Sequence, residues 1–145
     1  MPKHSHENQE PGHRHSHPAR ITARAKDVPG LIYIERRLED EAIVISGSLI
    51  IKTGVAQANE TIAEELEAAA RKINELGGVV GHIKASVAAS STHMISVTDE
   101  KAMVKESPLH KVQITLAAIV FAVEPEEAEN IVRQALSGIR ARMKE

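Results

Sequence analysis

The 145-residue chain contains no cysteine and no tryptophan. Without cysteine it can form neither disulfides nor thiolate-ligated zinc or iron–sulfur sites, and this favours a reducing compartment. Tyr33 and Phe121 are the only Phe, Trp or Tyr residues, so the chain lacks the aromatic platforms of single-strand nucleic-acid binders. The formal net charge of −2 supplies no basic field that would attract a polyanion. We therefore expect no nucleic-acid partner.

Long apolar runs are also missing from the sequence. The longest, residues 116–123, is far shorter than the roughly 20 residues of a membrane-spanning helix. The N-terminal residues are polar and lack the apolar centre of a signal peptide. We expect a soluble cytoplasmic protein with no membrane partner. Its length suits one domain, with a core built mainly from Ile, Val, Leu and Ala.

The N-terminal segment, residues 1–29, differs in composition from the remainder of the chain. Four prolines interrupt it, and its side chains are mostly His, Ser, Glu and Arg. Few large apolar side chains are present to offset the entropy lost on ordering. The composition predicts a disordered His-rich arm over residues 1–29 and a folded domain over residues 30–145.

Histidine is concentrated in the stretch HSHENQEPGHRHSHP, which holds five of the eight histidines. Neutral imidazole is a common ligand for nickel (Ni), cobalt (Co) and zinc (Zn), and closely spaced imidazoles on one backbone can close around one ion. The sequence predicts an arm that captures or stores a divalent transition metal, whereas an inert tail is the alternative. The predicted ligands are His4, His6, His13, His15 and His17.

The first half of the domain has a clear pattern of strands and one helix. LIYIERR and AIVISGSLIIK are rich in β-branched residues, with LEDE as the turn between them. Apolar residues at helical spacing follow over residues 59–76, where Thr61 and Glu64 form a capping-box pattern. Gly77 and Gly78 are expected to end this helix.

The second half is expected to contain three strands and a final helix. Residues 79–89 and 92–98 are predicted as strands around a turn near Ser90, residues 99–108 as a polar connection, and residues 111–123 as a long strand. Pro125 is suited to the first turn of the last helix. Apolar residues at helical spacing predict the buried stripe of this helix: Ala128, Ile131, Val132, Ala135, Leu136, Ile139 and Met143. The order β-β-α-β-β-β-α, with two helices covering one sheet face, predicts a two-layer α+β sandwich, loosely ferredoxin-like.

The uncovered sheet face is a second candidate site. Strand alternation directs Val79 and Ile83 toward the helices, and Ser46, Ser48, Gln113 and Thr115 toward the other face. On that face a small anionic ligand could bind, with the arm incidental; a solvated face or a subunit contact is the alternative. A turn near Ser90 would assemble the ligand-binding residues His82, Lys84, Ser86, Ser96 and Thr98.

No catalytic residues are predicted, so we expect a protein that is not an enzyme; an enzyme that uses His82 and Lys84 is the remaining alternative. GGVVGHIKAS lacks the residue order of a phosphate-binding loop. Ser90, His93 and Asp99 have none of the context of a nucleophile elbow.

Open sheet edges, with Ile119 and Phe121 facing away from the helices, predict a homo-oligomer. A client metalloprotein is the other expected partner, because a metal held by the arm needs a destination.

Overall fold

The computed structural model describes residues 28–91, 93–106 and 110–143. These residues form an α+β fold, which confirms the predicted class. The elements, in chain order, are β1 (Tyr33–Glu39), β2 (Ala42–Thr53), α1 (Val55–Glu75), β3 (Val79–Ser90), β4 (His93–Thr98), β5 (Lys101–Glu106), β6 (His110–Phe121) and α2 (Pro125–Arg142).

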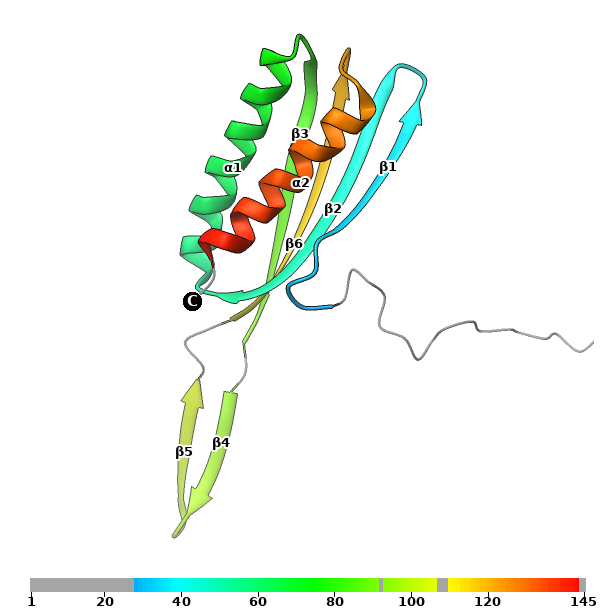
Figure 1. Ribbon diagram of the computed structural model, residues 1–145. Helices are drawn as coiled ribbons and strands as arrows, with labels where there is room; N and C mark the ends of the chain where they lie inside the picture. The colour runs from blue at the N-terminus through cyan, green and yellow to red at the C-terminus, as the bar shows by residue number, and fades with distance from the viewer. Residues whose placement is uncertain (1–27, 92, 107–109, 144–145) are drawn as a thin grey trace, which may run out of the picture.

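Four of the strands make one antiparallel sheet in the order β1-β2-β6-β3, and both helices lie on the same face of it (Figure 1). Because β2 and β3 both run antiparallel to β6, they are parallel to each other, and α1 is the crossover between them. This is the split βαβ arrangement of ferredoxin-like folds. The outer strand beside β2 is β1, which precedes β2 in the chain instead of following α2.

The core lies between the sheet and the helices. It is built from alternate residues of β2 and β6 and from one side of each helix. The largest side chains with under 2% exposure include Ile45, Leu49, Ile114, Leu116 and Leu136. The predicted buried stripe of the last helix is confirmed, from Ala128 to Met143. Within the described ranges, no helix combines the length and apolar character that crossing a membrane requires.

Residues 99–108 were predicted as a polar connection, and this was wrong for most of their length. Residues 101–106 form β5, which pairs with β4 as a two-stranded hairpin outside the main sheet. The described chain thus has six strands where five were predicted. Asp99 and Glu100 make the turn with φ of 51° and 68°, the left-handed conformation of a type I′ hairpin turn. The hairpin extends away from the end of the sheet (Figure 1).

Helix α1 begins earlier than its capping-box pattern predicted. Gly54 is its N-cap, without a side-chain hydrogen bond, and Thr61 is buried inside the helix. The added turn buries Ala58 completely, so tertiary packing extends the helix beyond the local signal. The predicted stop is confirmed: Gly77 has φ of 82°, and the Gly78 N–H donates to the Ile73 carbonyl at 2.9 Å.

Candidate functional site

The sheet face opposite the helices, called here the open face, is composed mainly of small and polar side chains. Its faces follow from the strand register, because residues paired across an antiparallel ladder point to the same side. Ser46, Ser48, Gln113 and Thr115 share this face, as predicted. Its rows in the order β1, β2, β6, β3 are Tyr33–Ser48–Thr115–Ser86, Glu35–Ser46–Ala117–Lys84 and Arg37–Val44–Ile119–His82.

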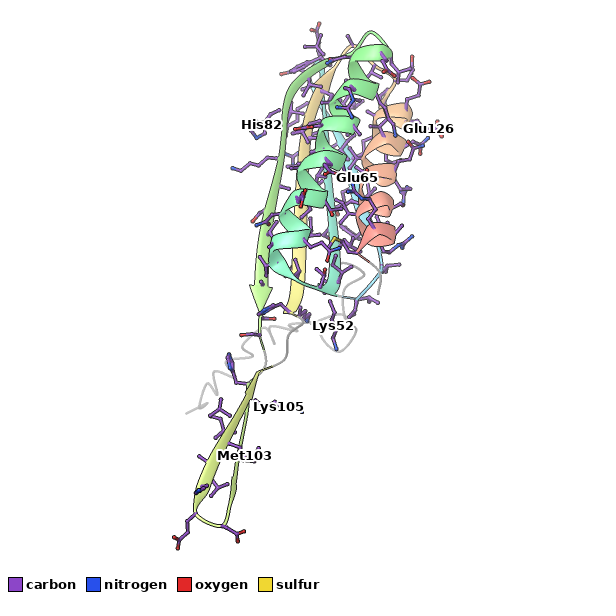
Figure 2. The ribbon with its side chains drawn as sticks, turned by 90° about the vertical axis from the view of Figure 1, so that its left-hand side faces the viewer. Lys52, Glu65, His82, Met103, Lys105 and Glu126 are labelled. Atoms are coloured by element: carbon purple, nitrogen blue, oxygen red, sulfur yellow. The ribbon has the colours of Figure 1, made fainter. Side chains whose placement is uncertain are left out.

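Three of the predicted ligand-binding residues lie together on β3. His82, Lys84 and Ser86 alternate along the strand, and all three are exposed on the open face. Figure 2 shows His82 extending from β3 on the side away from the helices. The arrangement gives one edge of the open face an imidazole, an ammonium group and a hydroxyl in a line.

The other two predicted ligand-binding residues are not part of this face. Ser96 and Thr98 lie on β4, where they pair with Met103 and Lys101 of β5. The expected pairing of β3 with β4 was wrong, because β3 pairs along its length with β6. After β3 ends at Ser90, the chain leaves the main sheet and forms the separate β4–β5 hairpin. It then returns to the main sheet as β6, which pairs with β3. The five-residue ligand site therefore does not assemble.

A register shift at Gly81 alters the predicted alternation at the start of β3. The shift lies between Val80 and His82, so that Val80 packs against the core while Val79 is 56% exposed. Val79 was expected to face the helices, and a bulge reverses its direction. A Cβ on Gly81 would lie 2.9 Å from Cε2 of Phe121. The phenyl ring thus rests over the glycine, and Phe121 is half-buried by its own sheet.

A carboxylate on β1 shifts the pKa of Tyr33, the one tyrosine of the chain. The hydroxyl of Tyr33 donates a hydrogen bond to Glu35 Oε1. This bond holds the proton on the phenol, and it raises the pKa of Tyr33 above its usual 10.0; desolvation and the negative charge of Glu35 act in the same direction.

We expect the Tyr33 phenolate to form only above pH 10, and Glu35→Gln to return its midpoint toward 10.0. The substitution removes the negative charge that opposes ionisation of the phenol. Absorbance near the phenolate maximum follows this residue alone, because the chain has one Tyr and no Trp. A midpoint that is unchanged by the substitution would contradict the contact. Glu39→Gln is the matched control on the same strand.

The N-terminal segment joins the domain at the end of the sheet from which the hairpin leaves. The Gly30 N–H donates to the Ile50 carbonyl at 2.8 Å, and Arg140 Nη1 donates to the Gly30 carbonyl at 3.1 Å. A hollow of about 820 Å³ beside these contacts is lined by Lys52, Arg140 and Met143 among others. Figure 2 places Lys52 at this end. Gly30, the first residue after the arm, is thus hydrogen-bonded to both β2 and α2.

The five predicted metal ligands, His4, His6, His13, His15 and His17, lie outside the described residues. The remaining histidines are on three different strands: His82 on β3, His93 on β4 and His110 on β6. His93 Nε2 lies 3.1 Å from Ser91 Oγ. Across the described ranges, no group of three or more His, Cys, Asp or Glu side chains could hold a metal ion.

Sequence reasoning missed one exposed surface, on the β4–β5 hairpin. Ile95 pairs with Val104 and Val97 pairs with Ala102, so these four side chains share one side of the hairpin. Ile95, Val97 and Val104 are 68%, 67% and 69% exposed. The signal was present in KAMVKE, whose alternation of Lys and Met with Ala and Val has the period of a strand.

Neither a scan against models of protein families nor a search of curated proteins gives a match to this chain. The open face, the apolar hairpin and the histidine arm are the features on which a function can be based.

Proposed function

We propose that the chain is a non-enzymatic metal-binding accessory protein of the cytoplasm. Its N-terminal arm captures or stores a divalent transition metal, Ni, Co or Zn, for a client metalloprotein. The observation that carries the proposal is the HRHSH segment, which places His13, His15 and His17 within five residues, with His4 and His6 close by. Imidazoles at this spacing can bind one ion together without a preformed cavity, since the backbone between them is short.

The attachment of the arm supports this role. Gly30 is hydrogen-bonded to β2 and α2, so the domain provides a fixed point for the segment that precedes it. Thirteen residues, 18–30, follow His17 up to this point, and a fully extended chain of that length spans up to roughly 45 Å. The ligands can therefore reach a client that docks at the hairpin end of the domain. Neutral His ligands with few enforced angles select ions by the general order of affinity.

Replacing the five arm histidines by asparagine in the full-length protein tests the proposal. We expect this variant to lose most of its capacity for Ni and Zn in calorimetric titration, because the imidazoles are the proposed ligands. The protein should be purified without a metal column, so that its native metal content can also be measured. Wild-type stoichiometry and affinity in this variant would rule the arm out.

The matched control replaces His82 and His110 by asparagine and keeps the arm. It should bind metal as the wild type does, because these two residues lie on different strands. Affinity of the wild type should fall steeply below about pH 6, since imidazole, with an ordinary pKa of about 6.5, must lose its proton to coordinate. Equal binding at pH 5 and pH 7.5 would contradict histidine ligation.

The alternative function is binding of a small anion on the open face. Its candidate ligand-binding residues are now His82, Lys84 and Ser86 alone, because Ser96 and Thr98 lie on the hairpin. It predicts that arm substitution changes nothing, while His82→Ala with Lys84→Ala removes stabilisation by inorganic phosphate or a carboxylate. Thermal-shift measurements on these two variants separate the two functions.

A further inference from the structure

The β4–β5 hairpin has an apolar side that the described part of the molecule does not cover. Ile95, Val97 and Val104 are each about two-thirds exposed, with Ala102 beside them in the register. Neither strand of the hairpin joins the main sheet. An isolated two-stranded hairpin is marginally stable in water and needs a surface against which to pack.

The open face is the candidate surface for such a hairpin. Toward the hairpin end its exposed side chains are Gln113 and Ala88, followed by Thr115 and Ser86, whereas Ile50 beside them on β2 is only 4% exposed. These side chains are mostly short, so a flat ribbon can approach the sheet closely. Ser48 is only 7% exposed, and its hydroxyl has no hydrogen-bond partner among the described residues. Because this hydroxyl is buried, a ribbon on the open face would pack on the exposed Thr115 and Ser86 beside it.

Charge and length indicate which molecule supplies the ribbon. The hairpin turn carries Asp99 and Glu100, whereas β3 carries Lys84 on the open face. From His93 to Asp99 is six residues, and from Ser90 back to Lys84 is also six, about 20 Å in each direction at strand geometry. A two-fold axis near residues 91–92 would therefore bring the acidic turn of one copy to Lys84 of another.

We propose that a second copy of this chain is the partner, and that two copies exchange hairpins across a two-fold axis. The side bearing Ile95, Val97 and Val104 lies on the open face of the other copy, with Asp99 and Glu100 against Lys84 of the partner subunit. Lys101 and Lys105 belong to the opposite side of the hairpin and point to solvent. Met103 and Lys105 of this outer side are marked in Figure 2.

The interface that results is modest in area. A six-residue hairpin covers roughly 20 Å by 10 Å of a sheet. Two reciprocal contacts, counted on both surfaces, reach roughly 800 Å² without the relief of the side chains, which is below the roughly 1,000 Å² of a stable specific interface and in the range of weak, transient association. At that size the charged contacts at the hairpin turn should affect the dimer strongly, since few other contacts can compensate.

Charge reversal tests the exchange, with mass measured by light scattering over a range of concentrations. Wild type should have twice the 15.7 kDa mass of the chain. The Asp99→Lys/Glu100→Lys variant and the Lys84→Glu variant should each dissociate at least about tenfold more readily. Mixing the two variants should restore the dimer, because both contacts then join opposite charges. The triple variant should also recover it.

A neutral turn controls for hairpin geometry. Asp99→Asn with Glu100→Gly improves a type I′ turn while removing both charges, and it should still weaken the dimer. A wild-type monomer, a trimer, a dimer indifferent to charge reversal, or reversed variants that do not associate when mixed would each overturn the exchange. Circular dichroism of every variant verifies that the domain remains folded, so that loss of the dimer is not loss of the fold.

Discussion

Replacing Leu136 by alanine is expected to lower the free energy of unfolding by about 3–5 kcal/mol, the range for large-to-small changes in a rigid core. Leu136 has no exposed surface and lies on α2 where the helix faces β2. Its Cδ1 lies only 2.6 Å from the position that a Cβ on Gly47 would occupy. Neighbouring strands are held by the sheet and cannot move in to fill the space. Chemical denaturation monitored by circular dichroism measures the change.

Arg133→Ala is the matched control for this experiment. Arg133 is on the same helix, three residues earlier, and is exposed. Exposed substitutions without a named contact usually change stability by less than about 0.5 kcal/mol. Equal losses in the two variants would show that helix α2 does not pack on the sheet through Leu136.

Gly47→Val is expected to destabilise the domain by about 1–3 kcal/mol, the usual effect of overpacking. The closeness of Leu136 Cδ1 leaves no room for a Cβ, and the added methyl groups would also meet the Tyr33 carbonyl oxygen and Ile34 Cγ1, which lie 3.5 and 3.7 Å from the Cβ position. In an exposed strand the same substitution would favour the β conformation. Ser46→Val, one residue away on the open face, should therefore be close to neutral.

The two substitutions should compensate each other when combined. Leu136→Ala removes the atom that Gly47→Val would strike, so the double variant should lose less stability than the sum of the single variants. For residues in contact, such a difference is typically about 0.5–3 kcal/mol. Strict additivity would mean that helix and strand do not meet at this point.

Much of the fold could be read from local patterns. The alternation of β2 and of the long strand β6, the helical spacing of both helices and the stop at Gly77 all agree with the structure. These signals are local, because side-chain period and a left-handed glycine depend on neighbours a few residues apart. The start of α1 could not be placed in this way. Burial of Ala58 decides it, and that burial depends on residues far along the chain.

The candidate sites show a similar division. Alternation correctly placed His82, Lys84 and Ser86 on the open face, but their expected neighbours Ser96 and Thr98 belong to a separate hairpin. Which strand pairs with which depends on contacts between distant segments, and Gly81 shows how one bulge changes the direction of Val79 and Val80. The alternation of apolar and polar residues along one strand specifies neither its partner strand nor the position of a bulge.

The sequence by itself determined the composition of the histidine arm, the lack of thiol chemistry, the α+β class and the two amphipathic helices. Each of these depends on residue types or on short-range periodicity. Only the tertiary structure decided the strand order β1-β2-β6-β3 and the separation of β4–β5 as a projecting hairpin. The strand order depends on how much apolar surface the whole sheet buries against both helices. Residues from every part of the chain contribute to that burial, so no local pattern specifies it. The exposed apolar side of the hairpin follows from that choice, because a segment left out of the sheet has no core to face.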